Sequence, residues 1–211
     1  MKKFAVLCTL ALSLNTAYAA TPLNESIAQL QHGWASANYQ THEKGREDAL
    51  NKLVKEAHQV TEANPGRAEA LIWEGIITST LAKYQSFFSA GGTAKAARDL
   101  LLSAEKIDAN ALDGSALTSL GSLYYKVPSG ISFGDHKKAR EYLERSLKIS
   151  PNGIDQNYFY ADFLLVEGEY AKSFEYFKKA LSAPARPGRE DADAGRRGDI
   201  QDGIKKAEKK I

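Results

Sequence analysis

Small and large apolar residues recur with one spacing in two stretches of the chain. The two sets are Ala139, Leu143, Ser146, Leu147 and Pro151, and Ser173, Phe177, Ala180, Leu181 and Pro184. The first four positions of the sets lie 34 residues apart, and the second proline comes one residue early. Spacings of three and four residues place side chains on one face of a helix. The pattern therefore predicts a helical unit that is repeated along the chain.

The same helical periodicity continues outside these two stretches. Sustained alternation of apolar and polar residues, which would indicate strands, is not seen. We predict about four helix pairs plus a C-terminal capping helix, with Asp113 and Asp135 as N-caps. The expected helices cover residues 23–37, 46–62, 67–84, 97–107, 114–124, 137–149, 156–166, 170–182 and 199–210.

Two segments interrupt the helix pairs at equivalent places. Residues 85–92 are expected to form a loop that carries Phe87 and Phe88, and residues 126–134 a loop that carries Phe133. Insertions in a repeat array fall on one face, which is often the binding face. We therefore expect both loops to fold against the same edge of the stack and to border a recognition surface. The alternative is that their rings fill gaps between irregular repeats.

The N-terminus has the pattern of a secretory signal peptide. Lys2 and Lys3 precede an apolar run over residues 4–14, and Ala17-Tyr18-Ala19 is a small-x-small cleavage site. We expect residues 1–19 to be removed, which leaves a single helical domain over residues 20–211 in the periplasm. The mature chain is expected to have no integral membrane segment, although an uncleaved anchor is the alternative.

Charge and motif content argue against several functions. Without Lys2 and Lys3 the 28 basic residues become 26, which equals the 26 acidic ones, so we expect no nucleic-acid partner. None of the four histidines stands four residues from another, so a helical zinc pair is missing. There is no Gly-x-Ser-x-Gly elbow and no Gly-Lys-Ser/Thr phosphate loop. We expect no catalytic residue, no metal and no cofactor.

The segment Leu117-x2-Leu120-Gly121-x2-Tyr124 resembles the first-helix signature of the tetratricopeptide repeat, with Leu117 where tryptophan is usual. The chain as a whole resembles an exported bacterial tetratricopeptide repeat protein, most clearly over residues 68–184. It is also similar, more distantly, to the T component associated with TRAP-type transporters. The resemblance implies a helical-repeat solenoid whose first helices line a concave face, where Trp73, Tyr125, Tyr158 and Asp162 would lie.

Aromatic and charged residues supply the candidate binding site. The candidates are Trp73, Phe88, Tyr125, Phe133, Tyr158 and Asp162. Aromatic residues are enriched at interfaces, but they also dominate cores, so a core role is the alternative. Asp162 and Glu74 sit in apolar company and need partners if buried; a structural hydrogen bond is the alternative to ligand contact. For the arginines at 186, 189, 196 and 197 we expect solvated charge, with pairing to an anionic partner as the alternative.

These observations favour a non-enzymatic periplasmic interaction scaffold. It would bind a protein partner through its concave face and its two insertions, in support of an envelope or transport complex. An acidic peptide tail is not expected as the ligand, because the concave positions lack the Lys, Arg and Asn of a carboxylate clamp. The alternative function is a small-molecule carrier with an aromatic-lined channel between the helices.

Overall fold

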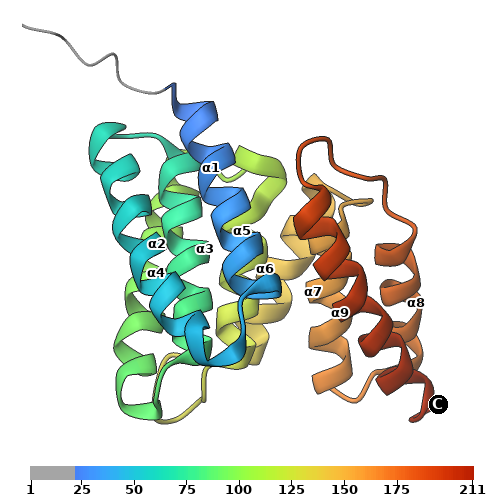
Figure 1. The fold of residues 1–211 in the computed structure, drawn as a ribbon. Coiled ribbons are helices and arrows are strands. Elements are labelled where there is room, and N and C mark those ends of the chain that lie inside the picture. Colours follow the sequence, from blue (N-terminus) through green and yellow to red (C-terminus); the bar gives the residue numbers. More distant parts are fainter. Residues whose placement is uncertain (1–21) are drawn as a thin grey trace, which may run out of the picture.

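The computed structural model describes residues 22–211, which form an all-α helical-repeat solenoid (Figure 1). The predicted signal peptide lies outside the described residues. Four helix pairs follow one another, and a last helix packs against the fourth pair, as predicted from the periodicity. In chain order the elements are α1 (Leu23–Ala35), which runs on as a π-helical turn η1 (Ser36–Gln40), α2 (Glu43–Ala63), α3 (Ala68–Tyr84), α4 (Phe87–Ile107), α5 (Ala111–Lys126), α6 (His136–Ile149), α7 (Ile154–Val166), α8 (Tyr170–Leu181) and α9 (Glu190–Glu208).

The first predicted loop, residues 85–92, is mostly helix. Helix α4 begins at Phe87, ten residues before the expected start at 97, and the carbonyl of Ser86 accepts from the amides of Ser89 and Ala90. Gly91 and Gly92 suggested a loop because glycine is a poor helix former. Here they lie inside α4. The inserted residues therefore lengthen a helix, whereas residues 127–134 do form a connecting segment between α5 and α6.

The last helix also begins earlier than predicted, at Glu190 instead of residue 199. Three acidic residues stand in its first turn, where they interact favourably with the helix dipole. The predicted cap at Asp113 is wrong: residues 112–114 adopt left-handed backbone angles, with φ of 48°, 57° and 73°, and no side-chain cap forms. The predicted cap at Asp135 is confirmed, because its carboxylate accepts from the amide of Lys138 at 3.0 Å.

The helices of a pair approach each other most closely where the first helix carries glycine. A Cβ placed on Gly75 would lie 2.7 Å from Leu101 Cγ, and one on Gly121 would lie 2.6 Å from Leu143 Cγ. Both leucines are fully buried. The missing side chain thus makes room for a leucine of the second helix, and any larger residue would push the two helices apart.

The apolar core forms three clusters along the stack. One joins α1, α2 and α3, the next extends from α3 to α7, and the third joins α7, α8 and α9. Each cluster shares a helix with the next, so burial of apolar surface stabilises the stack as a whole. No helix between residues 22 and 211 combines the length and the apolar character needed to cross a bilayer.

The close approach at Gly121 gives the first prediction. Gly121→Ala should lower the free energy of unfolding by about 1–3 kcal/mol, because the new methyl group overlaps Leu143 in a packed core. Gly198→Ala is the matched control, since Gly198 is exposed on α9 with no neighbour near its Cα. The control should raise the free energy of unfolding by up to about 1 kcal/mol through helix propensity. Urea unfolding followed by circular dichroism measures both, and equal stabilisation by the two changes would contradict the packing argument.

Candidate binding cavity

The last helix of the chain packs against the first. Ala192 of α9 belongs to the apolar cluster of α1, α2 and α3, and Gly195 presses directly on the ring of Tyr39. The hydroxyl of Tyr39 donates to Asp199 at 3.0 Å, and His32 Nδ1 lies 2.9 Å from the Asp191 carboxylate. In an open solenoid the concave side faces solvent along its length. Here contact between the two ends of the stack encloses that side.

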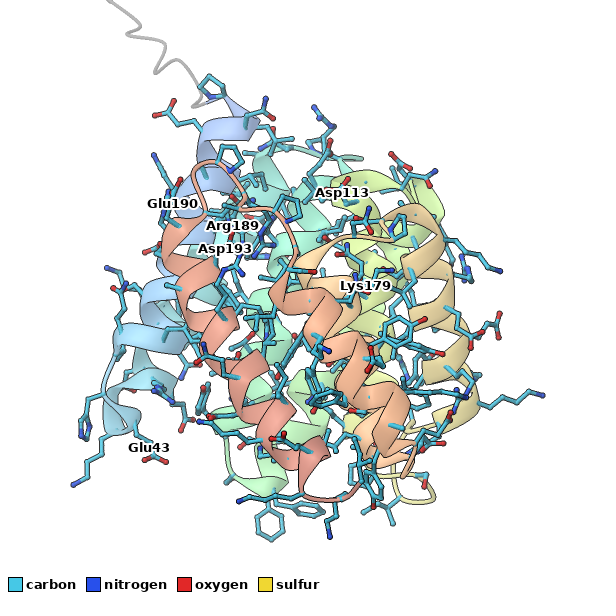
Figure 2. All side chains as sticks on the ribbon, turned by 90° about the vertical axis from the view of Figure 1, so that its right-hand side faces the viewer. Glu43, Asp113, Lys179, Arg189, Glu190 and Asp193 are labelled. Atoms are coloured by element: carbon cyan, nitrogen blue, oxygen red, sulfur yellow. The ribbon has the colours of Figure 1, made fainter. Side chains whose placement is uncertain are left out.

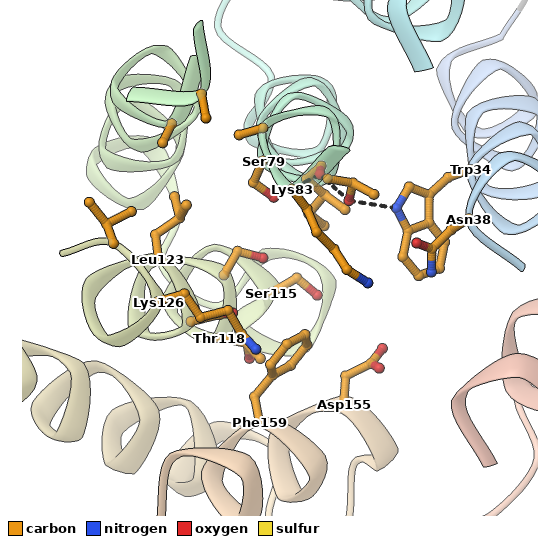
Figure 3. A pocket seen from close by; sticks show the side chains of 18 of the residues that line it. Trp34, Asn38, Ser79, Lys83, Ser115, Thr118, Leu123, Lys126, Asp155 and Phe159 are labelled. Atoms are coloured by element: carbon orange, nitrogen blue, oxygen red, sulfur yellow. Dashed lines mark hydrogen bonds between the residues drawn. The ribbon is translucent and has the colours of Figure 1, made fainter. Parts of the chain in front are cut away.

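A cavity of about 790 Å³ lies between α1, α3, α4, α5, α7 and the segment 186–199 (Figure 3). Five aromatic side chains form much of its wall: Trp34, Trp73, Phe87, Tyr158 and Phe159. The indole N–H of Trp34 donates to Thr80 at 2.9 Å, and the ring meets Trp73 edge-on at 6.2 Å between centroids. The wall is therefore aromatic and held in place by packing and hydrogen bonding.

The two ends of the cavity differ in exposure. Lining residues from the end of α3, the start of α4 and the α5–α6 segment are exposed, among them Lys83, Phe87, Lys95 and Ile131. At the opposite end the lining residues are buried or half-buried. The exposed residues therefore form a rim, and the segment 186–199 with the start of α7 forms a closed end.

A network of ion pairs builds the closed end, and we call it the clasp. It consists of Tyr39, Asp155, Arg186, Asp193, Arg196 and Asp199. The Asp155 carboxylate of α7 accepts from Arg186 at 2.6 Å and from Arg196 at 2.7 Å. Arg186 also donates to Asp193 at 2.7 Å, which lies with Arg189 at the N-terminal end of α9 (Figure 2). The clasp thus ties α7, α9 and η1 together.

Electrostatics within the clasp favour its charged form. Burial alone would raise the pKa of the Asp155 carboxyl, but the guanidinium groups of Arg196 and Arg186 outweigh it and hold this pKa well below its usual range. Arg196 is only 6% exposed, and its guanidinium carbon lies 4.2 Å from the centroid of the Tyr158 ring. Burial raises the pKa of the Tyr158 phenol, so this side chain of the cavity wall is uncharged at physiological pH.

The expectation of solvated charge is wrong for all four linker arginines. Arg186 and Arg196 belong to the clasp, and Arg197 donates to the carbonyls of Leu181 and Ala183. The contacts of Arg186 and Arg196 with Asp155 span 31 and 41 positions of the chain, so sequence spacing could not reveal them. The fourth, Arg189, stacks over Trp73 with its guanidinium carbon 5.1 Å from the ring centroid.

Two of the six candidate residues, Trp73 and Tyr158, line the cavity. Tyr125 is buried and donates to Asp162 at 2.6 Å, and Lys126 donates to the same carboxylate at 2.7 Å. Tyr125 and Asp162 therefore lie behind the cavity wall, where Asp162 has the structural partners that the alternative interpretation required.

The two phenylalanine candidates lie in contrasting environments. Phe88 is 96% exposed. Phe133 is half-buried: its ring meets Tyr124 edge-on at 5.7 Å, and the Arg98 guanidinium lies 4.6 Å from its centroid. Phe133 thus fills a gap beside the central cluster instead of facing solvent. Even so, the segments that carry these rings meet at the same cavity rim, through Phe87 and Gly92 on one side and Pro128 and Ile131 on the other.

Glu74, the other carboxylate in apolar company, faces away from the cavity. It is buried, and its Oε1 lies 2.9 Å from Nδ1 of His58 on α2. The hydrogen bond to Glu74 raises the pKa of His58. Glu74 is therefore a structural partner between two helices.

Several cavity residues were missed by sequence reasoning. Trp34, Lys83 and Lys95 line the cavity from α1, the end of α3 and the start of α4, and the resemblance to the repeat family assigned no role to these positions. The mixed charge of residues 186–199 was the one available signal for the closed end. Among the described residues, no group of three or more His, Cys, Asp or Glu side chains is arranged to hold a metal ion.

These features define a helical-repeat protein with an enclosed cavity. Residues 130–152 match the family model of the tetratricopeptide repeat, which includes the first of the two spaced sets in the sequence. No curated protein matches the chain.

Three solved structures are similar to the chain at low sequence identity. A structure described as MamA is 20% identical, with a TM-score of 0.44, over 79% of this chain and 90% of that one. The thermophilic TPR protein TTC0263 of Thermus thermophilus is 14% identical, with a TM-score of 0.46, over 87% and 99%. PilF of Pseudomonas aeruginosa is 17% identical, with a TM-score of 0.36, over 89% and 90%.

The clasp gives the second prediction. Asp155→Asn keeps the shape of the side chain but removes the charge that Arg186 and Arg196 share, and it should lower the free energy of unfolding by about 3 kcal/mol. Asp202→Asn on α9 is the matched control, because its pair with Lys205 is exposed and should matter by less than about 0.5 kcal/mol. Urea unfolding measures both. Equal midpoints for Asp155→Asn and the unmodified protein would show that the clasp contributes nothing to the fold.

Proposed function

We propose that the chain is an exported, non-enzymatic interaction protein that docks a protein partner on the rim of the cavity, within an envelope or transport complex. One observation carries the proposal. Phe87, Phe88 and Ile131 are 72%, 96% and 74% exposed, and Phe87 and Ile131 both line the cavity from different helix pairs. Exposed apolar side chains that gather in one place are typical of protein interaction sites.

The rings of Phe87 and Phe88 meet edge-on, with 6.1 Å between centroids, so they form a paired aromatic surface. Both residues lie in the first turn of α4, so the helix fixes the backbone from which the two rings project. Aromatic anchors of this kind supply much of the binding energy at protein interfaces. The expected partner therefore offers an apolar segment or pocket that covers the rim.

Residues 1–19 support export to the periplasm, because they combine a basic start, a short apolar run and a small-x-small site. A mature chain without cysteine would depend on its core and the clasp for stability there, with no disulfide to help.

The enclosed cavity favours a second candidate function, a small-molecule carrier. Ligand pockets in proteins commonly measure roughly 300–1,000 Å³ and combine apolar walls with a few polar groups. The cavity of about 790 Å³, with aromatic walls and charged ends, fits that description. Docking at the rim and binding in the cavity are compatible, since a partner seated on the rim would face the cavity.

Export is tested by cell fractionation. The protein should appear in the periplasmic fraction with its N-terminus at Ala20, because cleavage is expected after Ala19. N-terminal sequencing of the purified protein provides the measurement. Full-length protein in the cytoplasm would rule out the proposed location.

Partner docking is tested with Phe88→Ser, alone and with Phe87→Ser. Co-purification from the native envelope should lose its stoichiometric partner, while the melting temperature stays within about 2 °C because both rings are exposed. Ile107→Ser, at the other end of α4 and 48% exposed, is the matched control and should keep the partner. Phe133→Ser should instead lower the melting temperature, because its ring packs against Tyr124. Unchanged partner recovery with Phe87 and Phe88 both replaced would rule out the rim as the docking site.

A further inference from the structure

The lining of the cavity carries more positive than negative charge. Its basic residues are Lys83, Lys95, Lys126, Arg186, Arg189 and Arg196, and its acidic residues are Asp155 and Asp199. The mature chain as a whole is neutral by the count given above, so the imbalance is a property of this site. It reflects where the helices bring their charges together.

Only half of these cations have a carboxylate partner. Lys126 pairs with Asp162, and Arg186 and Arg196 pair within the clasp. Among the residues that the structure describes, no acidic side chain forms an ion pair with Lys83, Lys95 or Arg189. Three uncompensated positive charges therefore border one cavity, two at the rim and one at the closed end. Lys83 extends into the open space between Trp34 and Phe159 (Figure 3).

Of these three cations, Arg189 is the one with a buried donor that lacks a hydrogen-bond acceptor. Its Nε is buried and has no hydrogen-bond acceptor, although the guanidinium stacks over Trp73. The indole N–H of Trp73 is also buried without an acceptor, and this side chain is only 4% exposed. Burial and the positive charge of Arg186 lower the pKa of Arg189, and they outweigh the opposite effect of the Asp155, Asp193 and Asp191 carboxylates. A buried donor without an acceptor destabilises a fold, so two such donors side by side indicate a place where an acceptor-bearing ligand binds.

The distance between the two charged ends sets the length of a ligand. Trp73 and Lys83 are ten residues apart on α3, and a helix rises about 1.5 Å per residue, which gives roughly 15 Å. Trp34, Trp73, Tyr158 and Phe159 line the space between them. An apolar body would pack against these rings, while an acidic group would meet a cation.

We propose that the cavity binds an elongated amphipathic anion, with its acidic group at Arg189 and its apolar body along the aromatic wall. The proposal rests on the second candidate function, the small-molecule carrier, and it names the ligand class. The acidic group sits at the closed end because an ion pair is stronger where water is excluded. Lys83 and Lys95 at the rim attract the anion and retain it through longer-range electrostatics.

A pair of fluorescent probes that differ by one charged group tests this directly. 8-Anilinonaphthalene-1-sulfonate carries a sulfonate on the ring system that N-phenyl-1-naphthylamine has without charge. The chain has only two tryptophans, and both line the cavity. Energy transfer to either probe quenches tryptophan fluorescence and so reports binding of the probe, and the effect of the cavity variants assigns that binding to the cavity. Titrations give a Kd for each probe with the unmodified protein and each variant.

Arg189→Gln should weaken binding of the sulfonate probe about tenfold and leave the neutral probe within about twofold, because one charge-assisted contact is lost. Lys83→Gln should weaken binding of the sulfonate probe by less, about threefold, because Lys83 acts on the anion only through longer-range electrostatics. Lys52→Gln on α2, whose side chain is 82% exposed, is the matched control and should change neither Kd. Circular dichroism melting identifies any variant that does not fold. If Arg189→Gln does not fold, the two probes are compared on Lys83→Gln instead.

Selectively weaker binding of the sulfonate probe to Arg189→Gln, or to Lys83→Gln where Arg189→Gln does not fold, supports the proposal. If Arg189→Gln folds and only Lys83→Gln binds the sulfonate probe more weakly, the acidic group lies at the rim and the proposed orientation is wrong. If both variants change the Kd of the two probes equally, the cavity has no preference for an anion and that proposal is wrong. The proposed carrier function would be unaffected by this result. If neither probe quenches the tryptophans of the unmodified protein, the anion proposal and the carrier function both fall. The docking of a protein partner on the rim would be unaffected by that result, since it is measured separately with Phe88→Ser.

Discussion

The close contact between the two helices of each pair is the constraint on which the rest of the structure depends. Gly75 and Gly121 leave room for Leu101 and Leu143, and Ala161 takes the small position in the fourth pair, where its carbonyl accepts from Ser173 at 2.8 Å. Each pair becomes a thin hairpin with apolar outer faces. Such hairpins cannot bury those faces alone, so they stack. The stacking order then decides which faces of the first helices meet at the cavity.

Closure of the stack depends on a different kind of interaction. The pairs are held by apolar contacts, whereas α9 returns to the start of the chain through the clasp, which is polar and largely buried. Buried ion pairs contribute little net stability because desolvation offsets the attraction. They are directional, however, and an arginine bonded to two carboxylates allows few other positions of the helix that carries it. We infer that the clasp mainly fixes where α9 lies.

The sequence was sufficient to predict the helix pairs, because their apolar periodicity is a local property. It was insufficient where glycines lie inside helices, as in α4 and α9, because glycine is a poor helix former and suggests a loop. Trp73 and Tyr158, which the repeat pattern predicts on the inward face of first helices, line the cavity. Tyr125 lies behind the wall because Asp162 of α7 offers its hydroxyl an acceptor. The closed end depends on contacts between η1, α7 and α9. More than one hundred residues separate η1 from the other two helices, so sequence spacing could not reveal these contacts.

The clasp and the cavity share the same side chains, which couples stability to binding. Arg196 packs over Tyr158 and Phe159, and these two rings are cavity walls. A displacement of α9 would therefore remove part of the wall, the closed end and Arg189 together. A ligand that binds only the closed arrangement stabilises it in proportion to its concentration relative to its Kd. Binding of the proposed ligand would therefore favour the position of the last helix that is seen here.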